Sequence, residues 1–200
     1  LYFKNFEIQS LENHRVAITG SFHHHKPLTN ISNDPNIYGY FLSFYDENGT
    51  ETKSIINPYH EVIDFFDFKK YLYDREYAPS EKDLVKYSNG SIAPGGMHHF
   101  PRQLIKHKDK LIQVVEINHV LAGNEVTASQ HVFGNFIITQ YNLEGELEWK
   151  KSFLFKTDSK GAHYRSPATS IRFKENNDII ISYPSLDGIQ IVVIRDGNEI

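Results

Sequence analysis

The chain lacks cysteine, and this absence excludes disulfide bonds, thiolate catalysis and zinc sites built on cysteine. Positive charge is not in excess either. The 21 lysines and arginines against 25 aspartates and glutamates give a net charge of −4, so the electrostatics do not predict nucleic-acid binding. No apolar run approaches the roughly 18 residues that a membrane-spanning helix needs. We therefore expect no nucleic-acid partner and no membrane span.

The start of the sequence gives little information on targeting. No signal peptide or lipidation motif is visible, but Leu1 is not a natural start, so any leader would have been removed. The residues that are present are typical of a folded protein, because 40% of the 200 are hydrophobic and 14% are aromatic. A chain of this length can bury the core of one domain or of part of a larger one.

An apolar strand, a short polar turn and a second apolar strand recur three times along the chain. The turns contain asparagine or aspartate, which tolerate left-handed backbone conformations, and the flanking valines and isoleucines favour extended strands. The predicted strand pairs are Phe6–Ser10 with Val16–Thr19, Gln103–Ile105 with Leu111–Ile117, and Ser170–Phe173 with Ile179–Tyr183.

A second hairpin follows each of these. Its turn carries Asn-Gly, Glu-Gly or Asp-Gly, and such dipeptides between apolar strands are strong hairpin signals. Four strands joined in chain order as antiparallel neighbours are the layout of one β-propeller blade. The strands of the second hairpins are Tyr40–Tyr45 with Thr50–Ile55, Phe136–Tyr141 with Glu146–Phe153, and Ile189–Ile194, which is followed by the turn Arg195–Asn198.

The repeat predicts an all-β fold, and specifically a partial β-propeller of about three four-stranded antiparallel blades in a single region. Blade 1 covers about residues 6–56, an insertion covers 57–95, blade 2 covers about 96–156, and blade 3 covers about 161–200. Blade 3 is incomplete, because the return strand of its last hairpin is missing. A closed propeller has about four to eight blades, so we expect the rest of a longer chain or a protein partner to complete it. A β-sandwich with irregular loops is the alternative fold.

The segment Asn142–Trp149 resembles the outer-strand signature of PQQ-like and related propeller repeats. In that signature an aspartate or asparagine opens a turn, a glycine closes it and a tryptophan follows four residues later. Only the second copy carries the tryptophan, because the first copy has Lys53 at that position. The resemblance implies a propeller and not a quinone cofactor, so no cofactor is predicted, although a divalent metal is possible.

Two histidine motifs precede the first strands of blades 2 and 3. Gly96–Pro101 and Gly161–Pro167 share the pattern glycine, any residue, histidine, with a proline shortly after. In a propeller this position brings His98 and His163 to the mouth of the central channel, where they would bind an anion, a sugar or a metal. The alternative interpretation is structural: the glycine makes a turn, the proline ends the crossover and the histidine caps backbone groups. The predicted ligand-binding residues are His98, His99, Arg102, His163, Tyr164 and Arg165.

Other histidines and aromatic residues fall in the long connections. His23, His24 and His25 are adjacent, and adjacent side chains in an extended loop diverge, which leaves His23 and His25 as candidate metal ligands. The aromatic part of the insertion predicts either a lid that packs on the propeller or a surface that docks a protein partner. The predicted docking residues are Phe65, Phe66, Phe68, Tyr71 and Tyr73.

Three functions fit these features. No catalytic motif is complete, so the first hypothesis is a non-catalytic binding or scaffolding module of a larger cell-envelope or secreted assembly, outside the cytoplasm. The second is a carbohydrate-active propeller similar to a polysaccharide lyase, in which His98, His163, Tyr164 and Arg165 would transfer a proton and neutralise a uronate carboxylate. The third is a metal-dependent hydrolase.

Overall fold

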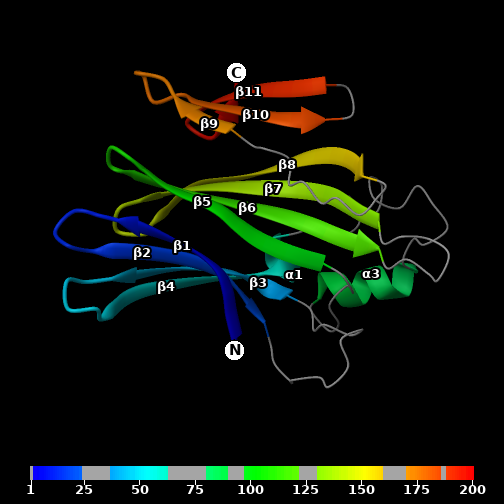
Figure 1. Cartoon of the computed structure of the whole chain (residues 1–200), viewed down its shortest axis with the longest axis horizontal. Helices are drawn as coiled ribbons and strands as arrows, with labels where there is room; N and C mark the ends of the chain where they lie inside the picture. The colour runs from blue at the N-terminus through cyan, green and yellow to red at the C-terminus, as the bar shows by residue number, and fades with distance from the viewer. Residues whose placement is uncertain are drawn as a thin grey trace.

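The structure is a computed structural model that describes residues 2–23, 37–62, 80–89, 97–121, 130–159, 170–185 and 188–200. Three antiparallel four-stranded sheets account for most of these residues (Figure 1). In each sheet every strand pairs with the next strand of the chain. The predicted all-β class and the three four-strand units are therefore confirmed, and the three sheets do not close into a ring.

The sheets are named here by their order in the chain. The first sheet contains β1 (Tyr2–Ser10), β2 (Val16–His23), β3 (Ile37–Tyr45) and β4 (Glu51–Pro58). The middle sheet contains β5 (Met97–His107), β6 (Lys110–Leu121), β7 (Gln130–Asn142) and β8 (Leu147–Ser159). The third sheet contains β9 (Ser170–Phe173), β10 (Ile179–Ser185), β11 (Gly188–Arg195) and β12 (Asn198–Glu199).

The strands differ from the predicted ones in two ways. The middle sheet is longer, because polar residues outside the apolar runs also pair: Met97 pairs with His119, and His131 pairs with Ser159. Backbone pairing satisfies amides and carbonyls whatever the side chain, so a hydrophobic pattern underestimates such strands. The expectation that the last return strand is missing is also wrong, because Asn198 and Glu199 begin it by pairing with β11.

The insertion between β4 and β5 contains two short helices among its described residues, α1 (Tyr59–Val62) and α3 (Glu81–Ser88). Helix α3 was not predicted, but its start has a capping residue. Ser80 Oγ accepts a hydrogen bond from the backbone N–H of Asp83 at 3.2 Å and donates one to the Asp83 carboxylate at 2.7 Å. Leu84 anchors the helix, since its side chain is buried.

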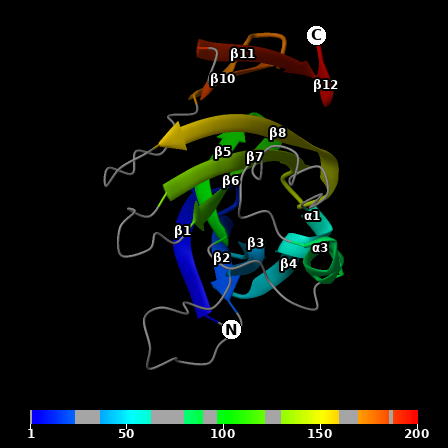
Figure 2. The same cartoon turned by 90° about the vertical axis from the view of Figure 1, so that its right-hand side faces the viewer.

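The three sheets stack in layers, with the middle sheet between the other two (Figures 1 and 2). Leu111–Glu116 of β6 are therefore all buried, although side chains alternate between the two faces of a strand. Leu111 packs toward the first sheet, whereas Ile112 and Val114 pack toward the third. A strand covered on both faces is rich in apolar residues, and this stretch of β6 contains Leu111, Ile112, Val114 and Val115, with Gln113 and Glu116 buried among them.

The contact between the first and middle sheets contains a buried hydrogen-bond network. Gln113 Nε2 donates to Thr19 Oγ1 at 2.6 Å and to the Phe41 carbonyl at 3.1 Å. Thr19 Oγ1 donates to the same carbonyl at 2.6 Å, and the Tyr141 hydroxyl donates to Gln113 Oε1 at 3.5 Å. Burial raises the pKa of Tyr141 to about 12, so its hydroxyl stays protonated. Buried polar groups need partners, and these groups find them across the two sheets.

The contact between the middle and third sheets is apolar and aromatic. Its centre is Phe136, whose ring stacks on Phe153 at 4.9 Å and meets Tyr183 edge-on at 5.0 Å. Ile138 from the middle sheet and Ile181 from the third are fully buried in the same cluster. Such aromatic pairs contribute about 0.5–1.5 kcal/mol beyond their burial.

Candidate functional site

The two ends of the stack carry different connections. The turns that join β1–β2, β3–β4, β5–β6, β7–β8, β9–β10 and β11–β12 gather at one end, on the left of Figure 1. At the opposite end, β2 ends at His23, β4 at Pro58, β6 at Leu121 and β8 at Ser159. Binding residues concentrate in the connections of rigid scaffolds, so either end of the stack can carry a site.

The β3–β4 and β7–β8 turns are built alike. The first residue of each, Asp46 or Asn142, accepts hydrogen bonds on Oδ1 from the backbone N–H groups two and four residues later. These bonds are 2.9 and 2.8 Å long for Asp46, and 3.1 and 2.7 Å for Asn142. Gly49 and Gly145 close the turns with φ of 75° and 78°, a conformation that favours glycine. The repeated sequence pattern thus corresponds to a repeated turn geometry.

The turn glycines of the middle and third sheets each lie against a side chain of the sheet that precedes them in the chain. A Cβ atom on Gly197 would be 3.0 Å from Cβ and Cγ of Trp149. A Cβ atom on Gly145 would be 2.6 Å from Phe44 Cε2 and 3.1 Å from Lys53 Cδ. Only a glycine fits so close to these side chains, so the turn glycines belong to the contacts between sheets.

The two contacts involve equivalent positions. Trp149 follows Gly145 by four residues, and Lys53 follows Gly49 by four residues. Gly49 is the corresponding glycine of the first sheet, and a Cβ atom on it would have no described atom within 4 Å. A turn glycine therefore contacts a side chain of the preceding sheet at both junctions between sheets. Gly49 of the first sheet makes no such contact with a described residue.

Ion pairs in or near the turns also join neighbouring sheets. The hydrogen bond from Lys106 lowers the pKa of Glu12, which lies in the β1–β2 turn. Solvent screens exposed pairs of this kind, so they align neighbouring sheets more than they stabilise the fold. The pairs are Arg15 with Glu144 at 3.7 Å, Lys53 with Glu146, Lys106 with Glu12 at 2.8 Å, and Lys151 with Glu199 at 2.9 Å.

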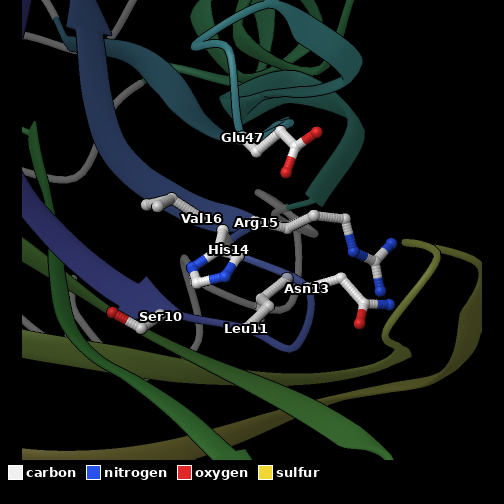
Figure 3. A pocket seen from close by; sticks show the side chains of 7 residues that line it. All are labelled: Ser10, Leu11, Asn13, His14, Arg15, Val16 and Glu47. Atoms are coloured by element: carbon white, nitrogen blue, oxygen red, sulfur yellow. The ribbon is translucent and has the colours of Figure 1, made fainter.

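A surface hollow of about 690 Å³ opens beside the β1–β2 turn (Figure 3). Figure 3 shows the His14 imidazole at the centre of the group and the Arg15 guanidinium pointing away from it. Asn13 and His14 both have a φ of 56°, which is an uncommon conformation for residues other than glycine. The hollow is lined by Ser10, Leu11, Asn13, His14, Arg15, Val16 and Glu47.

The chemistry of this hollow fits binding better than catalysis. The imidazole of His14 and the guanidinium of Arg15 can carry positive charge, but Glu47 brings a carboxylate to the same hollow, and Glu144 lies 3.7 Å from Arg15. Among the described residues, no hydrogen bond joins the Ser10 hydroxyl to His14, so no Ser–His nucleophile is formed there. The sequence predicts only a short turn between Ser10 and Val16, which contains His14, and the spatial approach of Glu47 identifies the hollow.

Three of the predicted histidines, His23, His98 and His99, are described, and they lie in strand segments at the opposite end. His98 and His99 are within β5, where they pair with Asn118 and Ile117, so the expectation that their motif precedes the first strand is wrong. His23 is the last residue of β2. The positions of His25, Phe65, Phe66, Phe68, Tyr71, Tyr73, His163, Tyr164 and Arg165 lie outside the described residues.

Arg102 has a carboxylate partner inside the protein. Pairing between β5 and β6 shifts between Pro101 and Gln103, so Arg102 occupies the bulge between them. Its Nε donates to Glu116 Oε2 at 2.7 Å, and the Glu116 side chain is buried. A buried carboxylate requires such a partner. This contact gives Arg102 a structural role beside the ligand-binding role that the sequence predicts for it.

A second buried carboxylate stabilises the third sheet. Arg195 donates two hydrogen bonds to Asp178, from Nε to Oδ1 and from Nη2 to Oδ2, each at 2.8 Å. Asn176 adds a third at 3.0 Å. The Arg195 guanidinium therefore lowers the pKa of Asp178 to about 2. The pair joins the β9–β10 turn to the end of β11, which is a structural role.

Within the part of the chain that the structure describes, no group of three or more histidine, aspartate or glutamate side chains could hold a metal ion. No helix in these ranges is long and apolar enough to cross a membrane.

Comparison with known proteins gives one distant likeness. No family model matches the chain, and no curated protein matches its sequence. A crystal structure of a "putative hydrolase" from Bacteroides ovatus ATCC 8483 matches 98% of this chain with 8% identity and a TM-score of 0.40. The match covers 50% of that protein, so this chain spans about half of its length.

Proposed function

We propose that the chain forms three consecutive blades of a β-propeller and serves as a non-catalytic binding platform in a larger cell-envelope or secreted assembly. The observation that supports the propeller most directly is the repeated contact at the turn glycines. The residue four positions after a turn glycine packs against the turn glycine of the next sheet. Lys53 packs against Gly145 in this way, and Trp149 packs against Gly197. A sandwich consists of two packed sheets, whereas here the middle sheet is covered on both faces.

The platform role rests on rigidity. Both faces of the middle sheet are buried, and ion pairs such as Arg15 with Glu144 and Lys151 with Glu199 join it to the two neighbouring sheets. Such a stack fixes the strand ends from which the long connections start, and connections on rigid scaffolds are a common basis for binding. In this proposal the partner is a protein that docks on the aromatic segment from Phe65 to Tyr73.

The test is a binding measurement with the complete protein. The partner would be captured on the immobilised protein, identified by mass spectrometry, purified and titrated. Replacing Phe65 and Phe66 with serine is expected to weaken binding by at least about tenfold, because aromatic anchors carry much of the energy of an interface. Val85→Ser is the matched control, since Val85 is an exposed apolar residue of α3 outside that segment. Unchanged affinity in the double variant would contradict the proposed docking segment.

The same preparation tests the enzymatic alternatives. Lyase activity would produce unsaturated sugars, detected by ultraviolet absorbance when uronate polymers are supplied. A signal that disappears in His98→Ala would replace the platform by a lyase. Bound metal together with metal-dependent hydrolysis would replace it by a hydrolase.

A further inference from the structure

The β3–β4 turn carries an asparagine that is followed directly by a glycine. Asn48 and Gly49 are both exposed, at the end of the stack where the turns gather (Figure 1). The backbone N–H of Asn48 donates to Asp46 Oδ1 at 2.9 Å, but the Asn48 side-chain amide forms no hydrogen bond with a described residue. The amide carbon is therefore accessible to water and to a nucleophile from the neighbouring backbone.

The glycine supplies such a nucleophile without steric hindrance. A side chain on the residue after an asparagine hinders the approach of its backbone nitrogen to the asparagine Cγ, and glycine has no side chain. A Cβ atom on Gly49 would have no described atom within 4 Å. The Gly49 N–H donates to the Asp46 carbonyl at 3.1 Å, but exposed hydrogen bonds at the tip of a hairpin open locally at low free energy. The Gly49 nitrogen can therefore leave the turn and react.

The corresponding glycines of the other two sheets are held in place. Gly145 lies against the ring of Phe44, and Gly197 lies against Trp149. Each of these glycines follows an acidic residue and not an asparagine. Among these three described turn glycines, the asparagine–glycine pair therefore occurs at the one that no described residue of a neighbouring sheet restrains.

We propose that Asn48 is a modification site, at which the folded protein deamidates with age to aspartate and isoaspartate. The Gly49 nitrogen loses its proton to hydroxide and attacks Asn48 Cγ. The new N–Cγ bond closes a cyclic imide, the Cγ–Nδ2 bond breaks, and ammonia leaves after taking a proton from water. Water then opens the imide at either carbonyl carbon, which gives aspartate or isoaspartate. In sum an amide and water give a carboxylate and ammonium, with no oxidation or reduction.

The products change both the charge and the length of the turn. A carboxylate at position 48 adds a negative charge beside Asp46 and Glu47. Isoaspartate also adds a backbone carbon before Gly49, so the N–H groups of Gly49 and Thr50 cannot both keep their present bonds to Asp46. Glu47 lines the hollow of Figure 3, so the modification alters the electrostatics next to that hollow.

The first experiment follows the complete protein by peptide mass spectrometry during weeks at body temperature. The mass increase of an amide-to-acid conversion is expected at Asn48, and it should be faster at mildly alkaline than at mildly acidic pH, because hydroxide takes up the proton. Asn198 is the internal control, since it is also exposed but is followed by Glu199. Conversion at Asn48 should be at least about tenfold faster. Asn89 also precedes a glycine, but it lies in a different tryptic peptide and is scored separately.

Two variants separate the effect of the sequence from the effect of the packing. Asn48→Gln should abolish the conversion, because its longer side chain does not close the same ring. Glu144→Asn creates an asparagine–glycine pair in the β7–β8 turn, where Gly145 is held against Phe44. The introduced amide should convert at least about tenfold more slowly than Asn48, because the contact between sheets restrains the attacking nitrogen. Equal rates at the two positions would overturn the argument from the open turn.

A synthetic peptide with the sequence of residues 44–53 gives the reference rate for a chain without a fixed turn. Conversion of the peptide while Asn48 of the folded protein keeps its amide overturns the proposal. Circular dichroism of the aged sample checks that the molecules have stayed folded. The measurement needs no binding partner, so its outcome is independent of the proposed binding platform.

Discussion

The two junctions of the stack are held together differently. Between the first and middle sheets, Gln113 reaches across to Thr19 and to the Phe41 carbonyl. Between the middle and third sheets, the centre is Phe136 with Phe153 and Tyr183. Hydrogen bonds require defined distances and angles, so the first junction fixes how two sheets align. The second gains more from buried area, which is less directional.

The largest effect is expected at the aromatic junction. Phe136→Ala removes a buried ring that touches both Phe153 and Tyr183, and such truncations cost about 3–5 kcal/mol. Urea unfolding followed by circular dichroism measures the loss. Phe136→Leu should lose clearly less, because it fills much of the same space. A loss below about 1 kcal/mol in Phe136→Ala would mean that the third sheet does not pack on this ring.

Substitution of the turn glycines should give the next largest loss of stability, and Gly49 provides an internal control. Gly49→Ala and Gly145→Ala both place a Cβ atom at a positive φ, which costs about 1–2 kcal/mol. Only Gly145→Ala also meets the Phe44 ring, at 2.6 Å, so its free energy of unfolding should fall by about 1–3 kcal/mol more. Equal losses in the two variants would show that the contact between the sheets does not constrain the turn.

Substitutions in the buried hydrogen-bond network should cause a smaller loss of stability. The losses at Gln113 and Thr19 should depend on each other, because the two side chains are hydrogen-bonded. Gln113→Met keeps a similar length but removes the donor to Thr19, and we expect a loss of about 1–3 kcal/mol. Thr19→Val removes the other side. In a double-mutant cycle the two losses should be non-additive by about 1 kcal/mol. Strict additivity would contradict a direct interaction between these side chains.

The ion pair of the third sheet should have the smallest effect, visible mainly in acid. The pKa of Asp178 is lowered from 3.8 to about 2, so the folded state favours the carboxylate and is stabilised above the unfolded pKa. This stabilisation is lost as the pH falls through about 2. Melting temperatures measured from pH 5 down to 2 should therefore fall further in the native chain than in Asp178→Asn. Parallel curves would contradict the assigned pKa.

Much of the fold could be predicted from local sequence. Alternating apolar residues defined the strands, and the glycine turns after Asn48, Glu144 and Asp196 defined the second hairpins. The repetition of these elements identified the four-strand unit, because a repeat reports on global architecture through local pattern. The extent of the middle sheet was underestimated, since backbone pairing extends through polar residues such as His98 and His131 that no hydrophobic pattern marks.

The sequence by itself determined the class of fold, the turns and the order of the strands, because these depend on residues close together in the chain. Only the tertiary structure decided which residues meet across sheets. It paired Arg102 with Glu116 through a bulge, connected Gln113 to a carbonyl 72 residues away, and brought Glu47 beside His14. It also decided that Ile138 is buried and Ile191 is exposed, although both lie in similar strands. Burial depends on whether a neighbouring sheet is present, and a strand's own sequence does not carry that information.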